Sequence, residues 1–264
     1  MLCFPGRTKQ GERQNTMGHF LDTVDTIPAG EGFALFGPVH LCWLGLYAVT
    51  AVLLARAYRR GGEEKRAKMR KTVAILLLLD EGWKHFWLIA GGNWTSAYLP
   101  LHLCSINIFL IAYHAFRPSR RVGAFLYTVC IPAATIALIT PTWSSLPVFN
   151  FMHLHSFSVH ILLACYPIML AAGGEARPRL RDLPGMVGIL LTMAVPIYFL
   201  NPVLDANFMF LDHAPEGTPL VWFREHWGNH LLGYPPLLAA LMAVMYGLGR
   251  LGEKVEGHAK AGKT

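Results

Sequence analysis

The stretch ALFGPVHLCWLGLYAVTAVLLA, residues 34–55, decides the fold class of this chain. It contains no Lys, Arg, Asp or Glu. Its length matches the roughly 20 apolar residues that a helix needs to cross the hydrocarbon core of a membrane. We therefore predict that this stretch, Ala34–Ala55, forms a transmembrane helix.

Six more apolar stretches of similar length follow along the chain. They are Thr72–Ala90, Tyr98–Phe116, Val122–Thr140, His153–Ala172, Leu183–Leu200 and Asn229–Leu248. Together they predict an all-α, polytopic (multi-pass) protein of the cell membrane, with seven transmembrane helices. We divide the chain into an extracytoplasmic tail over residues 1–33, a membrane domain over 34–250 and a cytoplasmic tail over 251–264. Met17 is an alternative first residue of the protein.

The composition agrees with a membrane protein. Of the 264 residues, 53% are hydrophobic and 15% are charged, whereas soluble domains carry about 25% charged residues. These figures exclude a soluble domain, a disordered chain and a disulfide scaffold. The net charge of +7 does not indicate nucleic-acid binding, because Lys and Arg lie in short segments between the apolar stretches. We expect no nucleic-acid partner.

The same basic residues predict the orientation. Most of the 23 Lys and Arg residues lie in the segments after the first, third and fifth apolar stretches and in the C-terminal tail. Cytoplasmic segments carry an excess of these residues. The N-terminus should therefore face out and the C-terminus in.

Polar side chains within the apolar stretches mark a candidate site, since ionisable groups inside a membrane are costly and usually functional. With this orientation most of the 12 histidines lie in or above the outer leaflet. We therefore predict a polar cavity there, against the alternative of scattered hydrogen bonds between helices. On the second stretch the i, i+4 spacing pairs Asp80 with Lys84 and Glu81 with His85.

Cys104 is the candidate nucleophile of this cavity. It shares a helix face with Asn107 three residues later, and both Cys104 and His160 should lie roughly 10 Å below the outer surface at 1.5 Å per residue. A thiolate nucleophile needs a base, usually histidine, and an oxyanion stabiliser. Cys42, Cys130 and Cys165 fit buried packing residues.

Several segments resemble the YwaF-like integral membrane proteins. LPLHLCS at residues 99–105 matches that family's signature, and shorter likenesses follow the same order along the chain. These are FGPVH at 36–40, Glu81 with Lys84, SVH at 158–160, NFMFL at 207–211 with Phe208 in place of Tyr, and Tyr234-Pro235. Distant relatives of that family include an acyltransferase that moves fatty acyl chains between glycerophospholipids through a cysteine. The resemblance implies that Cys104 is this cysteine and His160 its base.

The function that we predict is acyl transfer or ester hydrolysis on a membrane lipid. Cys104, His160 and Asn107 would catalyse it, with no metal and no cofactor. The substrate-binding residues would be His40, Glu81, Lys84, His85 and Asn207.

Two alternatives stay open. One is a zinc-dependent membrane hydrolase that uses the HxxxH pair His226 and His230. The other is a transporter or binding protein with Asp80, Glu81 and Lys84 as an ion relay.

Overall fold

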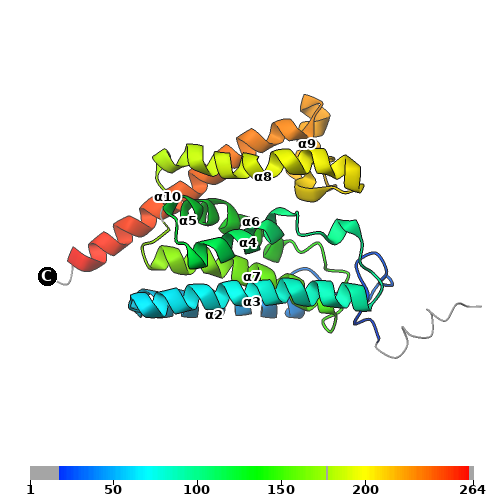
Figure 1. Cartoon of the computed structure of the whole chain (residues 1–264), viewed down its shortest axis with the longest axis horizontal. Coiled ribbons are helices and arrows are strands. Elements are labelled where there is room, and N and C mark those ends of the chain that lie inside the picture. Colours follow the sequence, from blue (N-terminus) through cyan, green and yellow to red (C-terminus); the bar gives the residue numbers. More distant parts are fainter. Residues whose placement is uncertain (1–17, 177, 262–264) are drawn as a thin grey trace, which may run out of the picture.

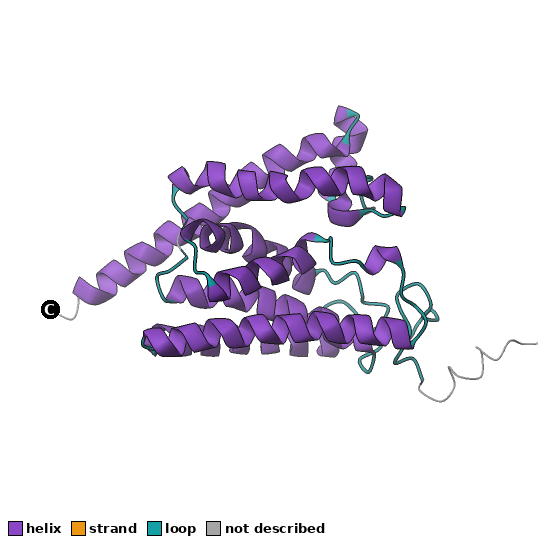
Figure 2. Cartoon of the chain, in the orientation of Figure 1, coloured by secondary structure: helices purple, strands orange, loops and turns teal. Residues whose placement is uncertain are grey.

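The computed structural model describes residues 18–176 and 178–261, with side chains up to residue 250. Every regular element within these residues is helical (Figures 1 and 2). The long helices are α2 (Pro38–Arg60), α3 (Glu63–Ala90), α4 (Leu103–Phe116), α7 (Phe151–Ala172), α8 (Leu183–Leu204) and α10 (Tyr234–Ala261). A further helical segment joins α5 (Arg120–Phe125), η2 (Leu126–Cys130) and α6 (Ile131–Ile139), and α9 (Pro219–Trp227) is short.

Five of the helical segments are long and apolar enough to cross a membrane. They are Pro38–Arg60, Arg120–Ile139, Phe151–Ala172, Leu180–Leu204 and His230–Arg250. The other two predicted spans correspond to α3, whose apolar part is interrupted by four ionisable residues from Asp80 to His85, and α4, which has only 14 residues. An all-helical chain with several apolar helices is thus confirmed, while the count of seven spans stays a prediction.

Helix α7 is the centre of the bundle. It packs against α2, α3, α4 and α6, and most of its apolar length is buried, whereas α2 and α8 are largely exposed. A helix that is apolar all round belongs in such a central position. The exposed apolar side chains of α2 and α8, among them Leu53, Phe199 and Val203, fit contact with lipid.

The basic segments lie together at one end of the bundle, as the orientation argument requires. This end holds the α2–α3 and α4–α5 connections and the end of α7 (left in Figure 1). Glu175, just after α7, accepts hydrogen bonds there from Tyr58 (2.7 Å), Arg70 (3.1 Å) and Arg66 (3.3 Å). We call it the inner end and the opposite one the outer end; which side of a membrane each faces stays a prediction.

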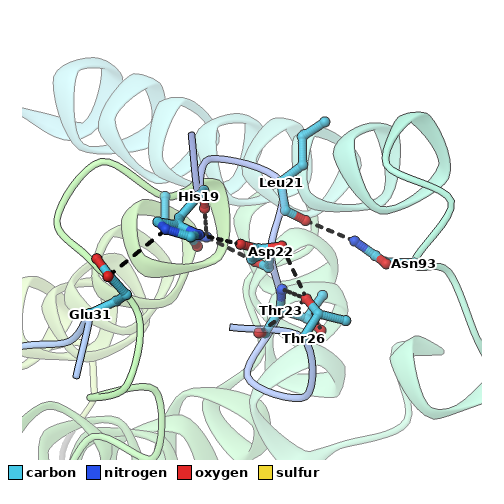
Figure 3. A network of polar contacts seen from close by, with 8 residues as sticks. His19, Leu21, Asp22, Thr23, Thr26, Glu31 and Asn93 are labelled. Carbon is cyan, nitrogen blue, oxygen red and sulfur yellow. Dashed lines mark hydrogen bonds and ion pairs between the residues drawn. The ribbon is translucent and has the colours of Figure 1, made fainter. Parts of the chain in front are cut away.

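The part of the N-terminal tail that the structure describes is packed onto the outer end (Figure 3). Asn93, after α3, donates a hydrogen bond to the carbonyl of Leu21 at 2.8 Å. Asn150, the N-cap of α7, donates to the carbonyls of His19 and Asp22. The ring of Phe20 lies edge-on to Trp87 at 5.1 Å. Residues 18–33 therefore form part of the folded unit; Met17 and the residues before it lie outside the described chain.

Helix α4 starts later than we predicted. The apolar stretch begins at Tyr98, but residues 96–98 form a 3-10 turn and the α-helix begins at Leu103. Pro100 lies between them, and a proline drives the preceding residue away from the α conformation. Cys104 is consequently the second residue of its helix, whereas the apolar stretch predicted that it lies six residues inside the helix.

A π-helical turn interrupts the fourth predicted stretch. It spans Leu126–Cys130 and joins α5 to α6 without a break in the helix. Such turns hold one residue more than a regular α turn. The thiol of Cys130, in this turn, donates to the carbonyl of Leu163 on α7 at 3.4 Å, which confirms the packing role expected of it. Cys165 is also buried, whereas Cys42 is exposed on α2, so the packing role expected of Cys42 is wrong within the described chain.

Candidate functional site

The first turn of α4 carries Cys104. The N-cap residue, His102, makes no side-chain hydrogen bond to the helix start, and the backbone N–H groups of Leu103, Cys104 and Ser105 have no partner among the described residues. The partial positive charge of a helix N-terminus stabilises anions placed there. Cys104 is half-buried against the apolar core.

Asn107 lies one turn further along α4 and is 1% exposed. Its side-chain oxygen is buried without a hydrogen-bond partner among the described residues. Buried polar atoms normally have partners, so each exception requires an explanation. A substrate hydroxyl group or a water at this position would satisfy it.

A strained loop covers the start of α4. Phe208 and Phe210 hold their rings against His102, with ring centroids 5.1 and 6.0 Å away. Met209 and Phe210 have positive φ angles of 55° and 56°, which non-glycine residues adopt only when their surroundings impose it. Hydrogen bonds hold the loop in this shape: Asn201 bonds both the N–H and the carbonyl of Phe208, and the Tyr234 hydroxyl lies within hydrogen-bond distance of the carbonyls of Met209 and Phe210.

His160 has the protonation pattern of a base. Its Nδ1 lies 2.6 Å from the carbonyl oxygen of Ser156. A carbonyl only accepts, so Nδ1 carries the hydrogen and Nε2 keeps its lone pair. No described residue donates a hydrogen bond to Nε2. The ring stacks on Trp143 with centroids 5.2 Å apart, so His160 is also a packing residue.

Helix α3 contributes a buried cluster of charges. Lys84 donates to Glu81 Oε1 at 2.5 Å, and the side chains of both residues are 7% exposed. His85 Nε2 lies 3.4 Å from the same oxygen. The predicted Glu81–His85 pair is therefore confirmed. The predicted Asp80–Lys84 pair is wrong, because Lys84 bonds to Glu81 three residues before it.

Asp80 instead bonds across to α7. Its two carboxylate oxygens accept hydrogen bonds from His155 Nδ1 at 3.2 Å and from the Ser158 hydroxyl at 2.6 Å. The other ring nitrogen of His155, Nε2, lies 3.9 Å from Glu81 Oε2, which is itself buried without a partner among the described residues. We did not assign His155 and Ser158 to the site. Their i, i+3 spacing on one face of α7 was the available signal.

Two residues that were predicted to bind substrate, His40 and Asn207, instead bond backbone groups of the protein. His40 bonds through both ring nitrogens, to the N–H of Phe36 and to the carbonyl of Leu138. Asn207 donates to the carbonyl of His213 and accepts from the N–H groups of Asp212 and His213. These contacts fix loops at the outer end.

Cys104 belongs neither to a cluster of possible metal ligands within the described residues nor to the pocket beside α8 and α9. Among the described residues no three His, Cys, Asp or Glu side chains gather as a metal site. His226 is stacked on Trp222 and bonds the carbonyl of that residue, and His230 bonds the carbonyl of Phe210. A pocket of about 380 Å³ at the outer end is lined by α8, α9 and His230 and includes neither Cys104 nor His160.

Comparison with known proteins gives a family. The family model described as the TMEM164 family matches residues 35–246. No curated protein and no solved structure matches the chain. The matched region runs from the residues just before α2 into α10 and includes Cys104, the α3 charges and His160. Because the model covers most of the chain, this protein belongs to the TMEM164 family of transmembrane proteins.

Proposed function

We propose that this protein transfers or hydrolyses the acyl chain of a membrane lipid, with Cys104 as the nucleophile. The observation that carries the proposal is the place of Cys104 in the first turn of α4, where free backbone N–H groups surround it. Such groups stabilise both a thiolate and the oxyanion of a tetrahedral intermediate. Asn107, with its unpaired side-chain oxygen, is buried one turn away. The resemblance to YwaF-like proteins points to the same cysteine.

The reaction would proceed in two halves. The thiol proton of Cys104 moves to Nε2 of His160, and the sulfur attacks the ester carbonyl carbon. The carbon–oxygen bond then breaks, the leaving alcohol takes the proton from His160, and the acyl group stays on sulfur as a thioester. A hydroxyl group of a second lipid, or water, later attacks the thioester and releases the thiol.

No hydrogen bond joins Cys104 to His160 among the described contacts. Catalytic hydrogen bonds often form only when substrate binds, and the proposed pair requires the two side chains to approach each other in the complex. The membrane setting suits a lipid substrate, because both residues lie in helices within the apolar bundle. The acyl chain would lie among the helices, and the polar groups of α3 would contact the headgroup.

Thiol labelling in native membranes tests this function. A lipid-like electrophile should label the parent protein, and Cys104→Ala should abolish that labelling. Cys165→Ala is the matched control, since Cys165 is fully buried on α7 and should leave labelling unchanged.

A second set of variants tests the base. His160→Phe keeps a ring against Trp143 but removes the base, so it should slow labelling of Cys104 about 10-fold or more, since a general base contributes about 10²-fold or more. Equal labelling of the parent and His160→Phe would refute the pair. Acyl transfer that persists in Cys104→Ala would refute the mechanism.

A further inference from the structure

A second histidine, His155, lies closer to the level of Cys104 than His160 does. Helices α4 and α7 both run from the outer to the inner end, and His114 Nδ1 contacts the Tyr166 hydroxyl at 2.9 Å near their inner ends. With a rise of 1.5 Å per residue, Cys104 lies about 15 Å outward from this contact and His155 about 16 Å. His160 lies only about 9 Å outward, roughly one turn deeper than Cys104.

Helix α3 connects His155 to this level of α4. It packs along both α4 and α7, and its Asp80 bonds His155 at the α3–α7 interface. The side chain of His155 is 7% exposed and that of Asp80 14%, so water competes little for their contact. The charged cluster therefore lies beside the segment that carries the nucleophile.

The hydrogen bonds of His155 fix its ring as a proton acceptor. A carboxylate only accepts, so Nδ1 carries the hydrogen that bonds Asp80, and Nε2 keeps its lone pair. Ser158 donates to the other oxygen of Asp80 and also bonds the carbonyl of His155, which holds the carboxylate in place. A base oriented by a hydrogen-bonded third group is the recurring pattern in nucleophilic catalysis.

Glu81 completes the arrangement. Its Oε2 lies 3.9 Å from His155 Nε2, too far for a hydrogen bond, and has no partner among the described residues. This carboxylate oxygen would stabilise the imidazolium that forms when His155 takes a proton. The two faces of the histidine are thus supplied with negative charge by Asp80 and Glu81.

We propose that His155, oriented by Asp80, is the general base that activates the hydroxyl group of the acyl acceptor. The acceptor is an alcohol, either a lysolipid hydroxyl or water. Its proton moves to Nε2 of His155 while its oxygen attacks the thioester carbonyl. The carbon–sulfur bond breaks, the sulfur of Cys104 leaves as a thiolate, and the proton on His155 returns to it. This role rests on the proposed function and divides the two half-reactions between two histidines.

The experiment separates the half-reactions. The full-length protein in detergent is mixed with a phospholipid that carries a labelled acyl chain, with and without a lysolipid acceptor, and quenched. The thioester on Cys104 and the transferred product are then quantified. His155→Gln should accumulate the labelled thioester and lower its turnover at least 10-fold, whereas His160→Phe should slow the formation of the thioester at least 10-fold.

Two further variants protect the test against loss of folding. Asp80→Asn keeps the side chain's shape and should also accumulate thioester, to a smaller degree. His153→Gln is the matched control, because His153 is likewise buried on α7. Its ring bonds the indole N–H of Trp43 and lies beside the carbonyl of Leu146, with no carboxylate among its described partners. This variant should turn over the thioester like the parent.

The outcomes distinguish this inference from the proposed function. Parent protein that never forms a thioester on Cys104 would overturn the proposed function and, with it, this role. Parent protein that forms it, beside His155→Gln and Asp80→Asn proteins that release it at the parent rate, would overturn the role of His155 alone.

Discussion

Removing the ammonium of Lys84 should destabilise the protein strongly, because it breaks a buried ion pair. Lys84→Met keeps most of the side-chain volume but leaves Glu81 without its closest partner, which lies at 2.5 Å. Both side chains are 7% exposed, so water can replace little of the lost interaction. Breaking one partner of a buried ion pair costs about 3–5 kcal/mol.

The structure places the expected cost near the lower end of that range. His85 Nε2 lies 3.4 Å from the same oxygen of Glu81. Because His85 Nδ1 accepts from the Trp94 indole N–H, Nε2 of the neutral ring carries a hydrogen that can bond this oxygen when Lys84 is removed. We therefore expect a loss of about 3 kcal/mol at neutral pH. At about 2–4 °C per kcal/mol for a chain of this size, the melting temperature should fall by roughly 6 °C or more. The loss should shrink as the pH falls and His85 gains a proton.

Thermal unfolding of the purified protein in detergent measures this effect. Glu81→Gln combined with Lys84→Met removes both charges and should recover much of the lost stability. Asp80→Asn combined with Lys84→Met is the matched control and should recover none, because Asp80 bonds His155 and Ser158 and not Lys84. Recovery by Asp80→Asn and not by Glu81→Gln would refute the pairing described here. A Lys84→Met protein as stable as the parent would show that Glu81 is solvated.

Three further predictions test other parts of the chain. Gly32→Ala would place a Cβ against the backbone of Ser144 and Ser145, so it should speed amide hydrogen exchange in residues 18–33. Gly45→Ala is the control, because the space around Gly45 is open, and it should leave this exchange unchanged. Glu175→Gln weakens three charge-assisted hydrogen bonds at the inner end, and thermal unfolding should show a loss of about 1.5 kcal/mol, the lower end for such bonds because the site is partly solvated; an unchanged melting temperature would contradict it. A reporter fused after Thr264 should be cytoplasmic and a tag within residues 202–228 accessible from outside, and a cytoplasmic tag in that loop would reverse the orientation.

Most of the helices could be predicted from the sequence, because long apolar runs leave few alternatives. Their ends could not. The apolar run begins at Tyr98, but the helix begins at Leu103. Pro100 is the one feature of the sequence that indicates this later start. This shift matters for the site, since it changes Cys104 from a residue inside a helix to one in its first turn.

The hydrogen-bond partners of the polar residues could not be predicted from the sequence either. Lys84 is three residues from Glu81 and four from Asp80, and both spacings bring side chains together on a helix. Lys84 pairs with Glu81 because Asp80 is already bonded by His155 and Ser158 of α7. Contacts between helices far apart in the chain decide such cases. The packing of residues 18–33 has the same cause, because side-chain amides of distant residues bind its backbone.

The π-helical turn at Leu126–Cys130 has a consequence for how this chain tolerates length changes. Each residue of an α-helix advances the chain by about 100° around the axis, and the extra residue of the turn therefore sets the phase of α6. Deleting one residue here would restore a regular helix but rotate all that follows it. The chain leads from α6 to Trp143, whose ring stacks on His160. A one-residue deletion in this turn would thus misplace the ring that covers a candidate base, although no side chain in contact with that base had been altered.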